Sequence, residues 1–295
     1  MDTAFKEQMD SYCAAFKGVL AQYLQSVHFR PDILDESMRY SLENGGKRLR
    51  PALMFAVARM LGSRIEDVAQ FALALEMIHT YSLIHDDLPA MDNDDYRRGK
   101  PSNHRVFGEG QAILAGDALL NDAYRICFEE CAKGKTYIAA AAVLCRNAGP
   151  DGMIAGQAAD LYYQGRAGAG KREAEFIVLH KTAKMIRSAV VIPAVVADMD
   201  ENIVALLDEF GRNFGLLFQL TDDMLDVTGD FEKLGKTIGK DAAENKLSYV
   251  QLYGMEECAA IADHALEVCE HILGELPFDT DFLLSLARYV RGRES

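Results

Sequence analysis

Residues 68–92 read VAQFALALEMIHTYSLIHDDLPAMD, an apolar stretch that ends in a cluster of aspartates. Its apolar side chains recur at three- and four-residue spacing, which is the period of one helix face. They are Val68, Phe71, Ala72, Leu75, Ile78 and Tyr81. The same spacing continues along most of the chain, and no stretch alternates apolar and polar residues as a half-buried strand would. The pattern predicts an all-α fold of roughly ten to thirteen helices.

Glycine, proline and polar runs set the boundaries of the predicted helices. We expect helices over residues 3–26, 33–43, 51–61, 65–88, 110–131, 136–147, 151–164, 172–197 and 201–228, with several shorter ones to residue 291. Charged residues crowd the breaks between these helices. Because loops at helix ends usually display functional side chains, the breaks are where we look for a site.

Length and composition favour one domain over residues 1–295. The chain is 49% hydrophobic, has 7 prolines and contains no linker-like stretch. Its longest uncharged apolar runs, near 136–145 and 188–197, are about ten residues long, whereas a membrane span needs about 18 or more. The N-terminal sequence MDTAFKEQMDSYC lacks the apolar core of a signal peptide. We therefore expect a cytoplasmic protein without a membrane span.

The formal net charge of −14 argues against nucleic acid or an anionic membrane as a partner, because both require an accessible positive field. The basic residues gather instead in a few short segments. This contrast favours a protein that binds a small anion at a defined site.

A second aspartate cluster, DDMLD at 222–226, lies within a predicted helix. Asp222 and Asp226 are four residues apart, so they differ by about 40° in azimuth and share one helix face. The carboxylates of Asp222 and Asp226 can therefore point into one site. Asp223 points elsewhere and is expected to support the site from its rim.

The first cluster, DDLPAMD at 86–92, has a different geometry. On an unbroken helix the six residues from Asp86 to Asp92 rotate by about 240°, which would turn the two carboxylates apart. Pro89 removes a backbone donor and disturbs the helix, so we expect the helix to end or bulge there. The break lets Asp92 return toward Asp86.

The two clusters together predict a Mg²⁺ site. Neighbouring carboxylates repel one another unless a cation neutralises them, and Mg²⁺ prefers oxygen ligands shared with water and substrate phosphate. A single acidic run is more often solvated surface. Here two clusters each follow an apolar segment and precede basic residues, a combination that a solvated face does not require.

Basic residues near the clusters predict phosphate binding. GGKRLRP at 45–51 places Lys47, Arg48 and Arg50 after a glycine pair at a predicted helix start, where the helix dipole also favours an anion. Arg97 and Arg98 follow the first cluster, and guanidinium groups match phosphate oxygens. Further candidates are Lys181, Lys236, Lys240 and Lys246. We expect two anionic groups, one held through metal and one held directly.

His79 lies seven residues before Asp86 on the same predicted helix face, close to these charges. It is therefore a candidate binding residue, although a lone histidine on such a face is often a core or capping residue. Glu76 and His79 also form a Glu-x-x-His pair, which di-iron helical bundles use twice. Because the sequence offers one such pair, we disfavour an iron site.

Six motifs in order resemble the trans-prenyl diphosphate synthase family, most closely its bacterial farnesyl diphosphate synthase type. They are GGKRLRP (45–51), IHTYSLIHDDLPAMDNDDYRRGKPSNH (78–104), GMIAGQAAD (152–160), HKTAKMI (180–186), FQLTDDMLDVTGD (218–230) and GKTIGKDAAENKLSYV (235–250). The resemblance covers nearly the full chain. It implies an isoprenoid synthase fold, with helices around a central catalytic cavity, and a homodimer.

The resemblance also implies roles for individual residues. Three Mg²⁺ ions, which Mn²⁺ can replace, would bind Asp86, Asp92 and Asp222 with help from Asp87, Asp223 and Asp226. The allylic diphosphate would bind Arg97, Lys181, Lys236 and Lys246, with Gln157 as a further contact. Isopentenyl diphosphate would bind Lys47, Arg50, His79 and Arg98. Thr182 and Gln219 would lie beside the cationic carbons, and Tyr81 and Ser82 would set product length.

The implied reaction is ionisation of an allylic diphosphate, attack by the double bond of isopentenyl diphosphate, and loss of a proton. An aromatic residue five positions before Asp86 resembles enzymes that stop at fifteen carbons. We therefore expect farnesyl diphosphate, made from dimethylallyl and then geranyl diphosphate. The tail sequence RGRES leaves open whether Arg291 or Arg293 closes the isopentenyl site.

Three alternatives remain. A geranylgeranyl diphosphate synthase would share every motif and differ in product length. A class I terpene cyclase would share the first cluster, but it would not need GGKRLRP and would usually carry an Asn/Ser/Glu metal motif in place of DDMLD. A non-catalytic regulatory subunit could lose its aspartates without penalty, whereas this chain retains both clusters.

Overall fold

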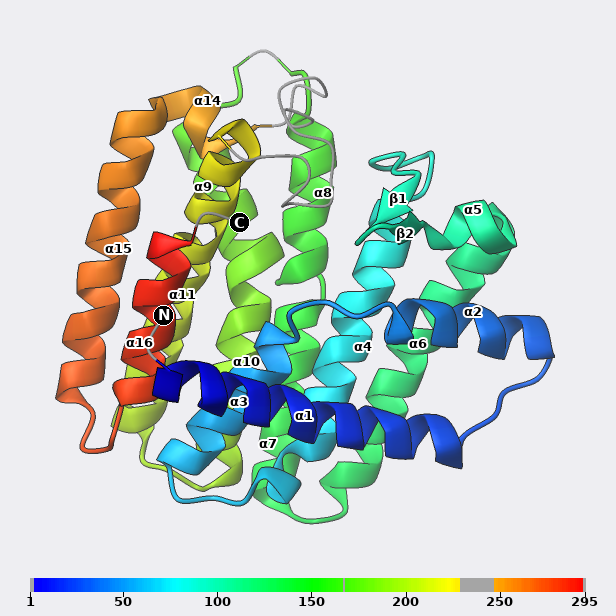
Figure 1. The fold of residues 1–295 in the computed structure, drawn as a ribbon, viewed down its shortest axis with the longest axis horizontal. Helices are drawn as coiled ribbons and strands as arrows, with labels where there is room; N and C mark the ends of the chain where they lie inside the picture. Colours follow the sequence, from blue (N-terminus) through cyan, green and yellow to red (C-terminus); the bar gives the residue numbers. More distant parts are fainter. Residues whose placement is uncertain (1–2, 167, 229–246, 294–295) are drawn as a thin grey trace.

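Helices make up most of the part of the chain that the structure describes (Figure 1). The computed structural model describes residues 3–166, 168–228 and 247–293. Its α-helices are α1 (Thr3–Ser26), α2 (Asp32–Glu43), α3 (Leu49–Met60), α4 (Ala69–Asp86), α5 (Asn103–Phe107), α6 (Glu109–Cys131), α7 (Lys135–Ala148), α8 (Met153–Tyr163), α9 (Lys171–Ile177), α10 (Lys184–Val196), α11 (Glu201–Thr228), α14 (Tyr249–Tyr253), α15 (Met255–Glu275) and α16 (Asp281–Gly292). A 3₁₀ turn, η1 (Ile65–Asp67), precedes α4. The all-α prediction is confirmed.

Two differences from the predicted helices bear on the site, apart from the short helix α5 (Asn103–Phe107), which was also not predicted. The helix predicted over 172–197 is divided into α9, a π-helical segment η2 (Val178–Ala183) and α10. The loop after the first aspartate cluster contains a hairpin of β1 (Tyr96–Arg97) and β2 (Lys100–Pro101). Its turn residues Arg98 and Gly99 have φ values of 54° and 77°, which suit a two-residue type I′ turn. Neither feature changes the hydrophobic period, so the period did not predict them.

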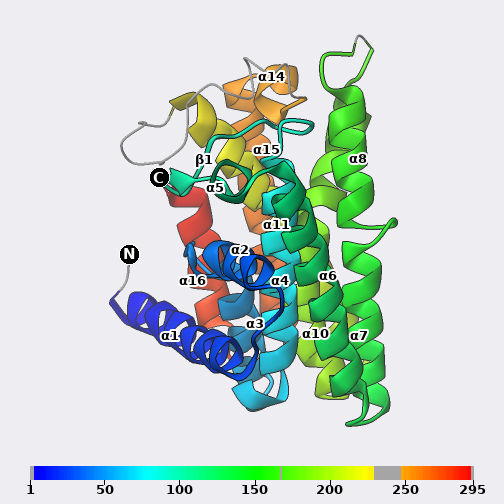
Figure 2. The ribbon, with the colours of Figure 1, turned by 90° about the vertical axis from the view of Figure 1, so that its right-hand side faces the viewer.

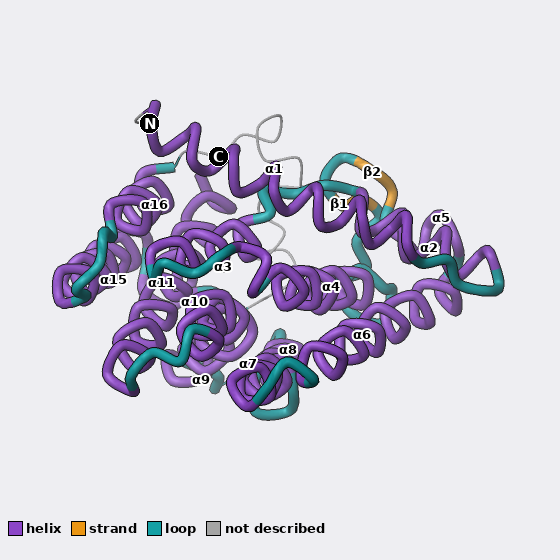
Figure 3. Tube along the Cα trace, turned by 90° about the horizontal axis from the view of Figure 1, so that it is seen from below, coloured by secondary structure: helices purple, strands orange, loops and turns teal. Residues whose placement is uncertain are grey.

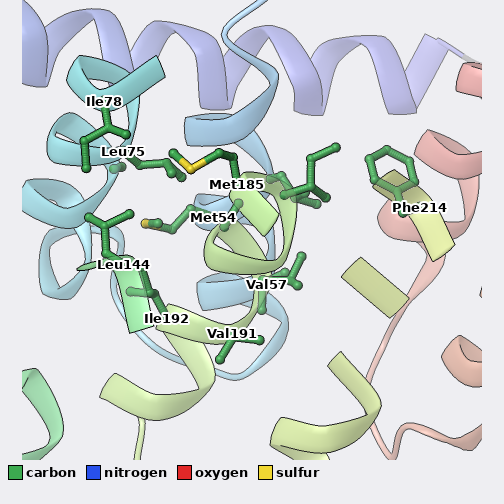
Figure 4. Close-up of a cluster of buried hydrophobic side chains, with 14 of the residues drawn as sticks. Met54, Val57, Leu75, Ile78, Leu144, Met185, Val191, Ile192 and Phe214 are labelled. Atoms are coloured by element: carbon green, nitrogen blue, oxygen red, sulfur yellow. The ribbon is translucent and has the colours of Figure 1, made fainter. Parts of the chain in front are cut away.

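The core joins helices from the whole length of the chain. Seen from below, α3, α4, α10 and α11 pack at the centre, with α6 and α7 on one side and α15 and α16 on the other (Figure 3). Figure 4 shows side chains from these helices interlocking: Met54, Val57, Leu75, Ile78, Leu144, Met185, Val191, Ile192 and Phe214. Burying each such side chain stabilises the fold by about 1.5–3 kcal/mol. The packing therefore joins these helices in one core.

Both aspartate clusters lie at the same end of the bundle. α4 and α11 each run from the lower to the upper end in Figure 1, and the clusters occupy their last turns or follow them. Turned by 90°, the molecule shows α6 beside the column that α7 and α8 form (Figure 2). Among the described residues, no helix has the length and apolarity that crossing a membrane requires.

Candidate active site

The first aspartate cluster lies where α4 ends. α4 stops at Asp86, and the chain turns back through Pro89. The backbone N–H of Asp92 then donates to the carbonyl of Asp86 at 2.8 Å, and the N–H of Asp94 donates to the carbonyl of Asp87 at 3.1 Å. The prediction that a break at Pro89 returns Asp92 to Asp86 is confirmed.

Asp86 is a buried carboxylate whose charged form is disfavoured. Burial raises its pKa to about 6, and the nearby Asp92 carboxylate raises it as well, while Lys181 acts in the opposite direction. A bound divalent cation favours the ionised form of a carboxylate. Asp86 therefore has the chemistry of a cation ligand.

Asp87 is held by Arg97 from the hairpin. Arg97 Nε donates to Asp87 Oδ1 at 3.0 Å, and Arg97 Nη2 contacts the same carboxylate and lies 3.5 Å from Asp94. Burial opposes the charge on Arg97, but Asp87 and Asp94 outweigh it and raise the Arg97 pKa. Arg97 thus links the hairpin to the end of α4. To bind a phosphate, its guanidinium would have to divide its N–H groups between the phosphate and Asp87.

Arg98 connects the hairpin to the Gly45–Gly46 loop. Its guanidinium donates to the Gly45 carbonyl and lies against Gly46, where a Cβ would overlap the guanidinium. Gly46 also has a φ of 115°, which other residues rarely adopt. The glycine pair therefore allows a basic side chain from 53 residues away to reach this loop.

Burial disfavours the charged forms of Lys47, Arg50 and His79. Arg50 Nη1 lies 3.3 Å from His79 Nε2, while the buried Arg50 Nε has no hydrogen-bond partner among the described residues. Burial, and then Arg50, hold the pKa of His79 well below its ordinary value. Burial and Arg293 lower the pKa of Lys47. A bound anion would stabilise the buried charges of Lys47 and Arg50, as expected for a diphosphate site.

Arg48 is separate from this group. Its side chain is buried, donates to Glu76 at 2.6 Å and to the carbonyl of Leu42, and lies over the ring of Phe16. The hypothesis that all three cations of GGKRLRP form one phosphate cradle is wrong for Arg48, because a buried carboxylate pairs with it. The same pair accounts for Glu76, which leaves no carboxylate for the Glu-x-x-His interpretation.

The second cluster is held by side-chain contacts on a regular helix. α11 continues without a break to Thr228. Both oxygens of Asp223 are bonded: Oδ1 accepts from Gln219 Nε2 at 2.8 Å, and Oδ2 accepts from the N–H of Tyr249 at 3.1 Å. Asp226 is buried, and Asp222 is ion-paired with Arg293. Asp223 therefore ties α11 to α14.

The π-helical segment η2 supplies Lys181 and Thr182. Thr182 Oγ1 donates to Gln219 Oε1 at 2.8 Å, so a chain of hydrogen bonds runs from η2 through Gln219 to Asp223. Gly156 on α8 and Gly215 on α11 face this segment, and a Cβ on either would overlap its atoms. The two glycines thus allow α8 and α11 to approach η2 closely.

Asp160 on α8 is a site residue that our sequence analysis missed. Lys181 Nζ donates to Asp160 Oδ2 at 2.7 Å and lies 4.0 Å from Asp86 Oδ2. Burial opposes the ammonium charge, but these two carboxylates outweigh it and raise the Lys181 pKa. The available signal was spacing, because Asp160 follows Gly156 by four residues within the GMIAGQAAD motif and so shares its face.

Gln157, also on α8, has a buried side-chain amide without hydrogen bonds to the described residues. Neither its nitrogen nor its oxygen has a hydrogen-bond partner among the described residues. Leaving such atoms unpaired costs about 1–3 kcal/mol. A bound ligand that supplied a partner would recover this free energy.

The two tail arginines have different surroundings. Arg291 pairs with Asp263 at 2.6 Å on the exposed side of α16. The Arg293 side chain is buried, contacts Asp222 and lies 4.5 Å from the ring centroid of Phe218. The structure therefore directs Arg293, and not Arg291, to the site.

The residues predicted to set product length lie in α4 below the first cluster. Tyr81 is buried and packs edge-on against His85 at 5.7 Å between ring centroids. The Ser82 hydroxyl donates to the carbonyl of His79 at 2.9 Å, so it is engaged with its own helix.

The carboxylates at this end of the bundle suit a hard divalent cation. Within the described residues no three ligands are already gathered around one cation position. Asp86, Asp92 and Asp222 nevertheless offer oxygen atoms only, and the raised pKa of Asp86 indicates a place where a cation would stabilise the charge. Lys236, Lys240 and Lys246 lie outside the described residues.

The fold and this arrangement of carboxylates and cations define a helical enzyme that acts on anionic substrates. A family model described as polyprenyl synthetase matches residues 31–274. The chain belongs to this family of trans-prenyl diphosphate synthases and is a prenyltransferase.

Known proteins of similar sequence span most of the chain. It is 41% identical to a farnesyl diphosphate synthase of Geobacillus stearothermophilus over 95% of each chain. It is 43% identical to a chloroplastic geranylgeranyl pyrophosphate synthase of Capsicum annuum, covering 90% of this chain and 73% of that protein. A crystal structure of geranyltransferase from Helicobacter pylori, complexed with magnesium and isoprenyl diphosphate, is 31% identical with a TM-score of 0.83, covering 98% of this chain and 97% of that one.

Proposed function

We propose that the protein is a Mg²⁺-dependent farnesyl diphosphate synthase, which condenses isopentenyl diphosphate first with dimethylallyl and then with geranyl diphosphate. The observation that carries this proposal is the pairing of two unlike sites at one end of the bundle. One joins Asp86 and Asp92 to Lys181, and the other contains Lys47 and Arg50, whose charges burial disfavours. Two such sites accommodate two diphosphates.

The allylic diphosphate binds on the carboxylate side. Asp86, Asp92 and Asp222 are the proposed ligands of up to three Mg²⁺ ions, and Mn²⁺ can substitute. Asp87, Asp223 and Asp226 assist them; Asp87 is bonded to Arg97, and Asp223 accepts from Gln219 and Tyr249. The magnesium in the geranyltransferase structure supports this choice of metal. Bound Mg²⁺ stabilises the negative charge of the departing pyrophosphate.

Lysine and arginine side chains complete both diphosphate sites. Lys181 and Arg97 bind the allylic diphosphate, together with Lys236 and Lys246, for which the sequence motifs are the support. Isopentenyl diphosphate binds the remaining group: Lys47, Arg50, His79 and Arg98. Because the pKa of His79 is held low, its ring is neutral, accepts a hydrogen bond from Arg50 and leaves the guanidinium charge for the substrate.

The chain's own groups guide the carbon chemistry. The Thr182 hydroxyl and the Gln219 amide are hydrogen-bonded to each other. They lie beside the proposed position of the allylic carbons, where their oxygen dipoles stabilise positive charge. The amide of Gln157 gains partners when substrate enters. The isopentenyl double bond attacks the allylic carbon, and a proton then leaves to pyrophosphate. No side-chain nucleophile takes part in these steps.

Tyr81 and Ser82 are the proposed floor of the chain-length pocket. Tyr81 lies five residues before Asp86, about 7 Å along the helix axis. We expect Tyr81→Ala to lengthen the product beyond fifteen carbons, and an unchanged product distribution would reject this floor.

One assay separates the product alternatives. The purified protein receives Mg²⁺, labelled isopentenyl diphosphate and either the five-, ten- or fifteen-carbon allylic diphosphate. We expect fifteen-carbon product from the first two and little from the third. Efficient use of the fifteen-carbon substrate would favour a geranylgeranyl diphosphate synthase, which the Capsicum relative supports. Release of no pyrophosphate in any arm would favour a regulatory subunit.

We further propose a homodimer that forms through α6, α7 and α8, which lie together on one side (Figure 2). Large apolar side chains are exposed on these helices: Ile113, Leu114, Phe128, Ile138 and Ile154. Phe128 is 77% exposed, and apolar surface of this kind commonly marks a protein interface. We expect Phe128→Glu to shift sedimentation toward monomer, whereas Phe176→Glu on α9 leaves it unchanged.

A further inference from the structure

Lys181 lies between two carboxylates that come from different helices. Its ammonium is hydrogen-bonded to Asp160 of α8 at 2.7 Å and is 4.0 Å from Asp86 of α4. The side chains of Asp160 and Asp86 are 14% and 12% exposed. With so little water to screen the charges, the choice of partner has a large electrostatic consequence.

The close approach of α8 to η2 places the backbone of Asp160 beside Lys181. Gly156 lies one turn before Asp160, and its lack of a side chain brings α8 against the backbone of Lys181. Moving the backbone of Asp160 away from Lys181 would therefore separate α8 from η2. By contrast, Lys181 has a long, flexible stem that can move its ammonium by more than the gap to Asp86.

Loss of Asp160 would leave Asp86 as the nearest carboxylate. The ammonium would then close on Asp86 and compete with a divalent cation for the same oxygens. We propose that Asp160 is a positioning residue that keeps the Lys181 ammonium off Asp86, so that Asp86 stays open to a divalent cation and Lys181 stays available to the diphosphate. This inference rests on the proposed function, because that function assigns both ligands.

The test is binding of Mn²⁺ in the presence of inorganic pyrophosphate, followed by electron paramagnetic resonance, together with steady-state kinetics. We expect Asp160→Asn to weaken Mn²⁺ binding about tenfold and to raise the KM for the allylic diphosphate more than it lowers kcat. Asp160→Glu, which keeps the carboxylate, should restore most of the binding.

Asp208→Asn is the matched control. Asp208 pairs with Arg187 at 2.6 Å between α11 and α10, away from the carboxylates of the site, and its side chain is 37% exposed. Breaking this pair should lower thermal stability to a similar degree and leave Mn²⁺ binding unchanged.

The Lys181→Met variant shows whether Asp160 acts by positioning the Lys181 ammonium or only through its own negative charge. In that background Asp160→Asn should change Mn²⁺ binding less than threefold, because no ammonium remains to compete. A full tenfold effect in the Lys181→Met background, or wild-type binding in Asp160→Asn alone, overturns the proposal.

If neither Asp160→Asn nor Asp160→Ala folds, the pair is structural and the proposal fails. Absence of product from the wild type would reject the proposed function, while the binding comparison would still decide the role of Asp160.

Discussion

The two aspartate clusters hold their carboxylates by different means. In the first, backbone hydrogen bonds fold the chain after α4 back on itself and set Asp92 beside Asp86. In the second, the backbone is an uninterrupted helix, and side-chain bonds from Asp223 to Gln219 and Tyr249 orient it. The first cluster should thus be sensitive to turn geometry and charge, and the second to the loss of hydrogen-bond acceptors.

The largest effect is expected from Asp86→Asn. Activity should fall by about a thousandfold, because a metal ligand contributes several kcal/mol of transition-state stabilisation. The metal-free protein should nevertheless become more stable at pH 8. The ordinary pKa of 3.8 rises to about 6 in the folded state, so the ionised carboxylate costs about 3 kcal/mol above pH 6.

Thermal melting without metal tests whether Asp86→Asn raises the stability of the protein, as predicted. The folded protein binds the Asp86 proton more tightly than the unfolded chain, so the penalty grows as the pH rises from 3.8 through 6. The gain in Tm should therefore be present at pH 8 and largely absent near pH 4. The exposed Asp117→Asn on α6 is the control, and a lower Tm for Asp86→Asn at pH 8 would contradict the burial argument.

For the second cluster, Asp223→Ala should lower both activity and stability. It leaves Gln219 Nε2 and the N–H of Tyr249 without their acceptor, which costs about 1–3 kcal/mol in denaturant unfolding. We expect activity to fall by about thirtyfold, or roughly 2 kcal/mol of transition-state free energy, because Gln219 and Thr182 lose their alignment.

Asp200→Ala is the matched control, because Asp200 accepts from the N–H of Ile203 at 3.0 Å at the opposite end of α11. It should lose comparable stability but keep its activity. Equal losses of activity in the two variants would mean that Asp223 acts only through the stability of α11.

We expect the pH dependence of metal binding to come from the first cluster. A cation must displace the proton of Asp86 below the pKa of about 6 that burial produces. Mn²⁺ affinity without substrate should therefore fall about tenfold between pH 7 and pH 5. Calorimetry measures this directly, and affinity that stays constant to pH 5 would exclude Asp86 as the titrating ligand.

Pro89→Ala should give the smallest effect, a rise of about threefold to fivefold in the Mg²⁺ concentration for half-maximal activity. An alanine lets α4 extend past Asp86 in a fraction of molecules, which turns Asp92 away from Asp86. Pro150→Ala, at an exposed break between α7 and α8, is the control. Unchanged Mg²⁺ dependence would show that the backbone bonds alone maintain the turn.

Much of the helical framework was predictable because its signals are local. The hydrophobic period gave the extent of α1 and α11, and Pro89 gave the end of α4. The π-helical turn was not predictable, because it depends on how Gly156 and Gly215 admit two neighbouring helices. The hairpin that carries Arg97 and Arg98 was likewise hidden within a polar loop.

By itself, the sequence determined the all-α class, the two aspartate clusters and the fold-back at Pro89, since a helix period and a missing backbone donor act within a few residues. Only the tertiary structure decided which partner each charge takes. Arg48 joins Glu76 in the core, whereas Arg50, two residues later, joins the proposed substrate site. Lys181 meets Asp160 from 21 residues away. The energy of a charge depends on burial and on the nearest opposite charge, and packing sets both.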